Sequence, residues 1–270
     1  MPWHAKSVAQ ETSDQKVAAD RPSGSPLMIR DLSVAYGPHE ILKSLSLTVA
    51  AGETLVILGE SGCGKTSLLK AIAGTVTPTR GQIQLAGVDI TSLPPAQRGI
   101  VYLDQDPLLF EHLTIEENLA FSLRLRREPA ERIEAEVTAM LAALDLQAHR
   151  HKREWQVSGG QKQRIAFGRA VLARPRLLLL DEPFCSLDGK TRTQMQTLFA
   201  TVVRERRLTS LFVTHDVKES LLVGDTFARL ESGSLRRYDT REVFKRDPAT
   251  GIPAEIAFWN EQSQRKEARS

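Results

Sequence analysis

Hydrophobic and polar residues alternate with a period of two in two stretches near the start of the chain. These stretches are residues 27–36 and residues 41–49, and a glycine follows each of them within three residues. A period of two places successive side chains on opposite faces of a strand, so that one face is buried and the other meets water. We therefore predict two antiparallel strands in this part of the chain.

Short runs dominated by apolar residues follow later, and segments with helical periodicity separate them. The runs are residues 54–58, 177–180 and 210–214, with a further strand pattern at residues 82–85 and a hairpin pattern at residues 225–238. The helical segments are residues 66–73, 128–147, 161–172 and 191–206. Apolar runs of strand length are typical of strands buried on both faces, and strands that alternate with helices form a mostly parallel sheet. We therefore predict an α/β fold, in which helices cover both faces of this sheet and an antiparallel β subdomain and a helical subdomain are attached.

The composition is that of a globular protein, with 270 residues of which 41% are hydrophobic and 26% are charged. The formal net charge of +3 is too small to indicate a nucleic-acid partner. No apolar run approaches the roughly 18 residues that a membrane-spanning helix requires, so a membrane role would depend on a partner. The two cysteines, Cys63 and Cys185, lie too far apart in the sequence for metal-ligand spacing.

A glycine-rich segment between the strand at residues 54–58 and the helix at residues 66–73 matches the phosphate-binding pattern G-x-x-x-x-G-K-[ST]. Its glycines allow backbone N–H groups to turn towards a phosphate, and the helix N-terminus adds positive charge. Lys65 can reach the β- and γ-phosphates of a nucleotide, and the Thr66 hydroxyl can bind Mg²⁺. The predicted nucleotide-binding residues are Gly59, Ser61, Gly62, Cys63, Gly64, Lys65, Thr66 and Ser67. The same helix N-terminus predicts a lowered pKa for the Cys63 thiol.

Two acidic residues, Asp181 and Glu182, directly follow the apolar run at residues 177–180. A carboxylate at the end of a buried strand beside a phosphate-binding loop can hold Mg²⁺ through water, which is the role we expect for Asp181. Glu182 would then face the terminal phosphate and could position or deprotonate an attacking water. Without the phosphate-binding loop, such a pair would more simply mark the end of a strand.

A second glycine-rich segment, Val157-Ser158-Gly159-Gly160-Gln161, precedes the helix at residues 161–172. It resembles the Leu-Ser-Gly-Gly-Gln signature motif of the ATP-binding cassette family, with Val157 in place of leucine. Together with the phosphate-binding loop and the Asp181–Glu182 pair, in the family's order, this motif gives a resemblance that covers residues 27–238. The resemblance implies a P-loop NTPase core for the predicted parallel sheet, with ATP and Mg²⁺ as cofactors.

The resemblance also implies that two cassettes dimerise head to tail, with each ATP between one subunit's phosphate-binding loop and the other's signature motif. The residues that would contact the partner's ATP are Ser158, Gly159, Gly160 and Gln161. Tyr36 resembles the aromatic residue that stacks on adenine, although a tyrosine at a strand end can also pack only against its neighbours.

Three further residues match motifs of the family. Gln105 resembles the Q-loop glutamine that senses Mg²⁺ and water, His215 the switch histidine that contacts the γ-phosphate, and Asp188 the aspartate of the D-loop, which crosses the dimer. The sequence departs from the family at Asp104, where an aromatic or aliphatic residue is commoner, and at Cys185–Ser186 in the D-loop. The resemblance thus implies catalytic roles for Glu182, His215 and Gln105, and Mg²⁺ binding by Thr66, Gln105 and Asp181.

Two segments favour a role in transport. Residues 108–121 resemble the part of transporter cassettes that receives a helix of the membrane subunit, although an amphipathic core segment would have the same pattern. Residues 242–250 resemble the end of the cassette in bacterial importers of polyamines, oxyanions and sugars, without the regulatory β-barrel that often follows. We therefore expect an ATPase that powers import at the cytoplasmic face of a membrane. Its expected partners are a second, identical cassette, a membrane permease and a substrate-binding protein.

The alternative is a cassette ATPase of DNA repair, chromosome maintenance or translation. Such chains carry long coiled-coil insertions, zinc-binding cysteine pairs or tandem cassettes, and this sequence has none of these. A binding module with an inactive ATP site is disfavoured because Lys65, Asp181, Glu182 and His215 are all present. The expected organisation is a disordered arm at residues 1–26, the ATPase domain at 27–245 with its helical subdomain at about 106–170, and an extension with a tail at 246–270.

Overall fold

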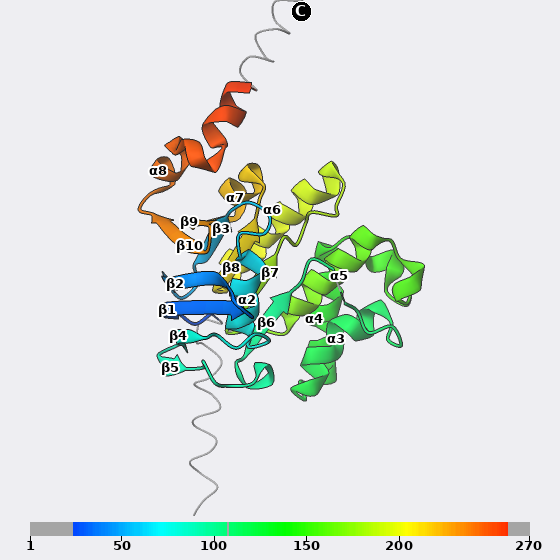
Figure 1. Cartoon of the computed structure of the whole chain (residues 1–270). Coiled ribbons are helices and arrows are strands. Elements are labelled where there is room, and N and C mark those ends of the chain that lie inside the picture. The colour runs from blue at the N-terminus through cyan, green and yellow to red at the C-terminus, as the bar shows by residue number, and fades with distance from the viewer. Residues whose placement is uncertain (1–23, 107, 259–270) are drawn as a thin grey trace, which may run out of the picture.

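The computed structural model describes residues 24–106 and 108–258 of the chain (Figure 1). Most of the expected N-terminal arm and the end of the expected tail therefore lie outside the described residues. The described backbone includes Gly24 and Ser25, which precede the predicted boundary at residue 27. The N–H groups of Gly24 and Ser25 donate to the carbonyls of Arg207 and Arg176, at 3.2 and 2.8 Å. These two bonds hold residues 24 and 25 against the rest of the domain.

A six-stranded sheet forms the centre of the molecule, with the strand order β10-β9-β3-β8-β7-β6 (Figure 1). Its strands are β3 (Thr54–Leu58), β6 (Ile100–Leu103), β7 (Leu177–Asp181), β8 (Ser210–Thr214), β9 (Thr226–Glu231) and β10 (Ser234–Tyr238). Neighbouring strands from β9 to β6 are parallel, and only β10 is antiparallel to its neighbour. The mostly parallel sheet is confirmed, and the hairpin turns at Ser232–Gly233 as the sequence predicts.

The central strands β3, β7 and β8 are dominated by apolar residues because each of their faces lies in a different hydrophobic core. In β3, Leu55 and Ile57 pack into one core, and Val56 and Leu58 pack into the other. The first core also contains helix α2 (Lys65–Ala73), which lies between the central sheet and a second sheet. The second core contains α5 (Gly159–Leu172), α6 (Gly189–Glu205) and α7 (Val217–Val223). Helices thus cover both faces of the central sheet.

The second sheet is antiparallel, with the strand order β2-β1-β4-β5. Its strands are β1 (Leu27–Tyr36), β2 (His39–Val49), β4 (Arg80–Leu85) and β5 (Val88–Asp89). In β1 the pairing register shifts between Ile29 and Leu32, where Asp31 adopts a φ of 47°. This bulge changes which positions are buried, so that Leu27 and Ile29 before it and Leu32 and Val34 after it all face the core. A strict period of two along the strand does not predict this change.

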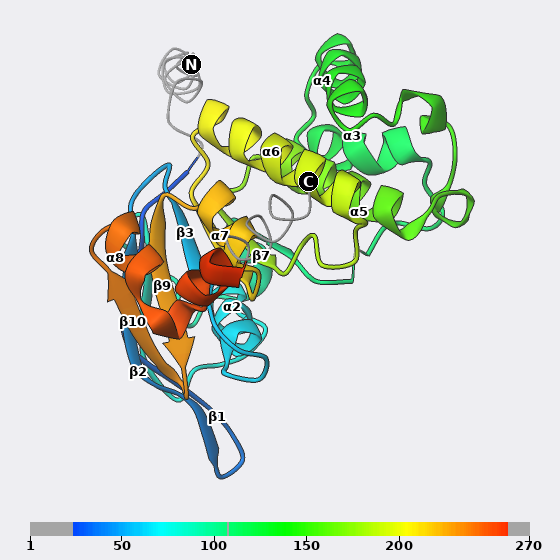
Figure 2. The same cartoon turned by 90° about the horizontal axis from the view of Figure 1, so that it is seen from above.

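Helices α3 (Ile115–Leu125), α4 (Ala130–Ala143) and α5 lie to one side of the two sheets (Figure 2). The apolar face predicted for α4 is confirmed, since Val137, Met140 and Leu141 are buried. Helix α3 begins at a capping box formed by Thr114 and Glu117. The last elements within the described residues are α8 (Arg241–Arg246) and a helical segment over residues 252–258. None of the helices within the described residues is both long enough and apolar enough to cross a membrane.

Gly168 lies where α5 packs closely against α3 and α4. A Cβ atom at this position would lie 2.7 Å from Leu144 Cδ1, 2.9 Å from Leu119 Cδ2 and 3.0 Å from Met140 Cγ. Gly168→Val should therefore lower the free energy of unfolding by about 1–3 kcal/mol, because it overpacks this core. Chemical denaturation measures the change. Gly189→Val is the matched control, since no atom lies within 4 Å of a Cβ there, and an equal loss in both variants would contradict the overpacking explanation.

Candidate nucleotide site

The carboxyl ends of the parallel strands bring most of the predicted site residues to one edge of the sheet. Gly59 follows β3, Gln105 lies two residues after β6, Glu182 follows β7 and His215 follows β8. These four strands are neighbours in the order β3-β8-β7-β6. Ligands of open α/β sheets bind at this edge, where strand ends and loops converge. Segments more than 150 residues apart in the chain therefore meet at a single site.

The glycine-rich loop turns sharply between β3 and α2. Gly64 has a φ of 110°, and a Cβ atom there would lie 2.9 Å from Leu42 Cδ2, so that only glycine fits. Lys65 is the first residue of α2, and its ammonium donates to the carbonyls of Gly59 and Glu60, at 2.7 and 2.8 Å. The lysine is 95% buried and is held across the loop. A fixed positive charge therefore lies at the N-terminus of a helix, an arrangement that attracts phosphate.

A cavity of about 400 Å³ opens above this loop. Its lining residues are Tyr36, Ile41, Ser61, Gly62, Gly64, Lys65, Thr66, Ser67, Gln105 and Glu182. The structure thus unites the tyrosine of β1, the glycine-rich loop and residues that follow β6 and β7. Ile41 of β2 was not predicted as a lining residue, because its hydrophobic side chain was assigned only to the strand pattern. Tyr36 is 47% exposed, which leaves its ring accessible to a flat ligand.

Asp181 lies beneath the cavity at the end of β7 and is buried. Tyr102 donates its hydroxyl proton to Asp181 Oδ2 at 3.0 Å, and Thr66 also forms a hydrogen bond with this carboxylate. Burial raises the pKa of Asp181, and these two hydrogen bonds oppose the rise. Tyr102 belongs to β6, which the sequence pattern did not predict, so its contact with Asp181 was missed.

The oxygen atoms of Asp181 and Thr66 are of the kind that Mg²⁺ prefers. Within residues 24–106 and 108–258, no three His, Cys, Asp or Glu side chains are grouped so that they alone could hold a metal ion. A nucleotide-bound Mg²⁺ usually takes one or two protein ligands and completes its shell with phosphate and water, so two oxygen-bearing side chains are enough. The residues present therefore fit a nucleotide-bound Mg²⁺.

Glu182 lies between a cation and an imidazole. Its Oε2 is 2.8 Å from His215 Nδ1, in a hydrogen bond, and its Oε1 is 4.0 Å from Lys65 Nζ. The backbone of Glu182 has a φ of 46°, a conformation that residues other than glycine seldom adopt. Its N–H donates to the carbonyl of Val213 in β8, at 3.0 Å, which holds this conformation. Such strain is found most often where a side chain must point in one functional direction.

The signature motif lies outside this cavity, since none of its residues belongs to the lining. Ser158 is the N-cap of α5 and forms a capping box with Gln161, whose Oε1 accepts from the Ser158 N–H at 2.9 Å. Gly159 has no atom within 4 Å of a Cβ built on it, and Gly160 is closest to Leu187. In one chain, therefore, the motif and the glycine-rich loop do not form a common site.

Asp188 is the N-cap of α6, and its Oδ1 accepts from the N–H groups of Lys190 and Thr191, both at 3.1 Å. Hydrogen bonds from Thr191 keep the pKa of Asp188 below its usual value. The sequence-based expectation for Cys63 is wrong in direction. Burial raises the pKa of the Cys63 thiol and outweighs the opposing charge of Lys65.

Comparisons with known proteins give the family of the chain and its relatives. The ABC transporter family model matches residues 42–185. PhnT of Salmonella typhimurium, a putative 2-aminoethylphosphonate import ATP-binding protein, is 41% identical over 226 residues, 83% of this chain and 61% of that protein. WtpC of Pyrococcus abyssi, a molybdate/tungstate import ATP-binding protein, is 40% identical over 235 residues, 86% of this chain and 68% of that protein. PotA of Clostridium acetobutylicum, a spermidine/putrescine import ATP-binding protein, is 39% identical over 220 residues, 82% of this chain and 62% of that protein.

A solved structure shares the fold. It is the dimeric, post-hydrolysis state of the ATP-binding cassette MJ0796 bound to ADP and Pi, with a TM-score of 0.70 and 27% sequence identity. The match covers 78% of this chain and 97% of that one. This chain spans less than two thirds of the length of the first curated relatives, which have further residues beyond the shared region. From the family model, the identities and the fold together, the chain belongs to the ABC transporter family.

Proposed function

We propose that the chain is the ATP-binding and ATP-hydrolysing subunit of a membrane importer. The observation that carries this proposal is the convergence of the glycine-rich loop, Asp181, Glu182 and His215 at one edge of the sheet. The names of the curated relatives, all of which are import ATP-binding proteins, support the direction of transport. The ATPase domain is proposed to cover residues 27–245, with a helical subdomain at about 106–170.

The glycine-rich loop and Lys65 hold the phosphates of ATP in this proposal. Backbone N–H groups from Gly59 to Ser67 point towards the phosphate chain, and the Lys65 ammonium, which now contacts two loop carbonyls, moves to the β- and γ-phosphates. Tyr36 stacks its exposed ring on the adenine at the other end of the cavity.

Three side chains would hold a nucleotide-bound Mg²⁺, namely the hydroxyl of Thr66, the carboxylate of Asp181 and the amide of Gln105. When bound, this ion would supply positive charge against the negative charge that develops as the γ-phosphoryl group passes to water and ADP leaves. Tyr102 holds the Asp181 carboxylate in place through its hydrogen bond to Oδ2. Removal of Mg²⁺ with a chelator is expected to stop turnover.

Glu182 accepts a proton from the attacking water or positions this water, and His215 contacts the γ-phosphate. Their hydrogen bond at 2.8 Å fixes both side chains before the nucleotide binds. Lys65 Nζ lies 4.0 Å from the same carboxylate, so the Glu182 side chain is held between the cation and the imidazole.

A second copy of the chain completes each site, because the signature motif lies outside its own cavity. Ser158, Gly159, Gly160 and Gln161 contact the ATP of the partner, and Asp188 lies at the dimer contact. The dimeric state of the cassette MJ0796, bound to ADP and Pi, supports this arrangement.

The substrate class is proposed only as a small solute taken up through a membrane permease. The relatives carry names for 2-aminoethylphosphonate, molybdate or tungstate, and spermidine or putrescine, which differ in charge. Similar cassettes therefore serve chemically different substrates, and the selecting contacts belong to the permease and a substrate-binding protein. The chain lies at the cytoplasmic face of the membrane in this proposal.

The test is purification of the tagged Glu182→Gln chain with ATP from detergent-solubilised membranes of its own source. A stoichiometric membrane protein with several spans is the expected companion, and it should be released when ATP and Mg²⁺ are removed. Recovery of only nucleic-acid-bound or ribosomal partners would instead favour the alternative of a cassette ATPase outside transport. Phosphate release by the wild-type chain, with and without Mg²⁺, tests the ATPase part separately.

A further inference from the structure

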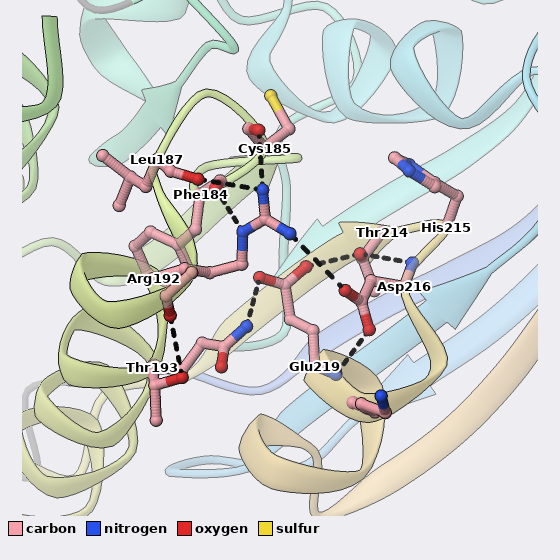
Figure 3. Close-up of polar contacts among 12 residues, drawn as sticks. Phe184, Cys185, Leu187, Arg192, Thr193, Thr214, His215, Asp216 and Glu219 are labelled. Atoms are coloured by element: carbon pink, nitrogen blue, oxygen red, sulfur yellow. Dashed lines mark hydrogen bonds and ion pairs between the residues drawn. The ribbon is translucent and has the colours of Figure 1, made fainter. Parts of the chain in front are cut away.

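Arg192 lies one turn into α6 and binds the backbone of the D-loop, which comprises residues 184–188. Its guanidinium donates from Nε to the carbonyl of Phe184 at 3.2 Å and from Nη2 to the carbonyls of Cys185 and Leu187, both at 3.0 Å (Figure 3). Three carbonyl groups of one short turn therefore converge on a single planar cation. A guanidinium can satisfy such a set because its five N–H donors have a fixed geometry.

The same guanidinium faces the segment that carries His215. Its Nη1 lies 4.0 Å from Asp216 Oδ2, and Asp216 directly follows His215 in the chain (Figure 3). Asp216 is also the N-cap of α7, where its Oδ1 accepts from the Glu219 N–H at 3.0 Å. Arg192 thus joins the D-loop to the beginning of α7.

A second pair connects α6 to α7 one turn away. The Gln196 amide donates to Glu219 Oε1 at 3.2 Å, and Glu219 Oε2 accepts from the Thr214 hydroxyl. The Thr214 Oγ1 in turn accepts from the Asp216 N–H at 2.9 Å. Burial raises the pKa of Glu219, and the nearby charge of Arg192 is among the groups that oppose the rise. The residues on both sides of His215 are therefore held against α6.

These contacts close a ring. Glu182 begins the D-loop turn, since its carbonyl accepts from the Cys185 N–H at 3.3 Å, and its side chain is bonded to His215. The ring runs from Glu182 through the turn to Arg192, then to Asp216, His215 and back to Glu182. It surrounds a cavity of about 80 Å³ that is lined by these residues and by Glu219. A displacement of the turn cannot leave His215 unaffected while Arg192 holds both segments.

We propose that Arg192 is a positioning residue that couples the position of the D-loop to that of His215 and Glu182. Its role rests on the proposed function, in which Asp188 lies at the contact with a second subunit. Engagement of that subunit then moves the turn, and Arg192 transmits the movement to the side chains that act on the γ-phosphate.

Stability alone does not explain this arrangement. The side chains of Arg192 and Asp216 are each 34% exposed, and partly exposed ion pairs of this kind contribute little to folding. Asp188 already caps α6, and asparagine at position 216 would cap α7 as aspartate does. Arg192 lies instead between the D-loop and the segment that carries His215 and Asp216. In the proposed function, these two loops are nearest the γ-phosphate.

The first experiment measures backbone hydrogen exchange in the nucleotide-free chain, and it does not depend on ATP turnover. In Arg192→Gln, exchange should become about tenfold faster in both residues 184–188 and residues 215–219. Asp216→Asn, which keeps its size and its cap, should speed exchange in residues 184–188, to which it does not belong. Arg204→Gln, on the exposed end of the same helix, is the control and should change neither segment. Faster exchange in only one of the two segments for Arg192→Gln, or in residues 215–219 alone for Asp216→Asn, would overturn the proposal.

The second experiment measures steady-state ATP hydrolysis. Arg192→Gln should lower kcat by about tenfold or more, with the KM for ATP changed by less than about twofold, because groups that bind the nucleotide are retained. Arg192→Lys, which keeps the charge but not the fork of donors, should recover little of the loss. The double variant Arg192→Gln/Asp216→Asn should be no slower than Arg192→Gln. The reason is that each of the two changes breaks the same connection, the ion pair between Arg192 and Asp216.

Wild-type kcat in Arg192→Gln, or losses that multiply in the double variant, would refute the coupling. If Arg192→Gln does not fold, the coupling is tested with Asp216→Asn instead. Hydrogen exchange in residues 184–188 and kcat for ATP hydrolysis are then measured in that variant. Absence of hydrolysis by the wild-type chain would refute the proposed function, whereas the exchange experiment would still test whether Arg192 connects the two loops.

Discussion

Replacement of Glu182 by glutamine will lower ATP turnover by about 10²–10⁴-fold while ATP binding is retained. Glutamine has the shape of glutamate but cannot accept a proton, so the loss measures proton transfer or the charge of the carboxylate. The size of the group and its bond to His215 are largely preserved. ATP should therefore accumulate on the protein, and the dimer with ATP at its interface should persist.

The position and backbone conformation of Glu182 are the reasons that we assign the catalytic role to this residue. Among the carboxylates described at the site, Glu182 is the one that lines the cavity above the glycine-rich loop, whereas Asp181 lies beneath that cavity with one oxygen bonded to Tyr102. Its left-handed backbone turns the side chain towards His215 and Lys65. A residue held in this way can act on water at the terminal phosphate.

Phosphate release measures turnover in this variant, and equilibrium binding of a fluorescent ATP analogue measures affinity. Glu205→Gln on the exposed end of α6 is the control, since it makes the same chemical change far from the cavity. Turnover at the wild-type rate in Glu182→Gln would remove this residue from the catalytic role. A parallel loss of binding would show that the substitution disturbs the loop instead.

Replacement of Lys65 by alanine will weaken ATP binding by about 10–100-fold, because hydrogen bonds to a charged group contribute about 1.5–3 kcal/mol each. In the structure its ammonium bridges the carbonyls of Gly59 and Glu60 from a buried position. Alanine is a good helix former and should be accepted at the start of α2. The expected effect is therefore on the phosphate site and much less on folding.

Calorimetric titration with ATP and with ADP measures this effect. The loss should be larger for ATP, since Lys65 is proposed to contact both the β- and γ-phosphates. Lys70→Ala, in the last turn of the same helix, is the matched control and should bind both nucleotides normally. Equal affinity of Lys65→Ala and the wild-type chain for ATP would contradict the proposed position of the phosphates.

The sequence predicted the parts of the fold in which one physical signal dominates. Strands β3, β7 and β8 are dominated by apolar residues because both of their faces are buried, and helix α2 ends at Gly74, which has a φ of 87°. Strand β6 was missed because four residues of mixed burial give no clear pattern. Helix α3 was not assigned, although its capping box was readable in the sequence at Thr114 and Glu117.

Site residues were predictable where a side chain acts directly on a ligand through a known motif. Lys65 and Glu182 were predicted from the strand ends that they follow, and Gln105 from its resemblance to the Q-loop glutamine. The structure places all three on the lining of one cavity. Tyr102 and Arg192 were not found, because each acts on another group of the protein. Arg192 binds main-chain carbonyls, and no pattern of residue types reveals where carbonyl groups converge.

The shared hydrophobic core has a consequence for how this protein folds. Leu119 and Met140 of the helical part belong to the same core as Val56 and Leu180 of the central sheet. The helices and the sheet therefore gain their stability from the same buried surface and should unfold as one cooperative unit. A fragment that contains only α3 to α5 would leave one side of that core in water and would not be expected to fold by itself.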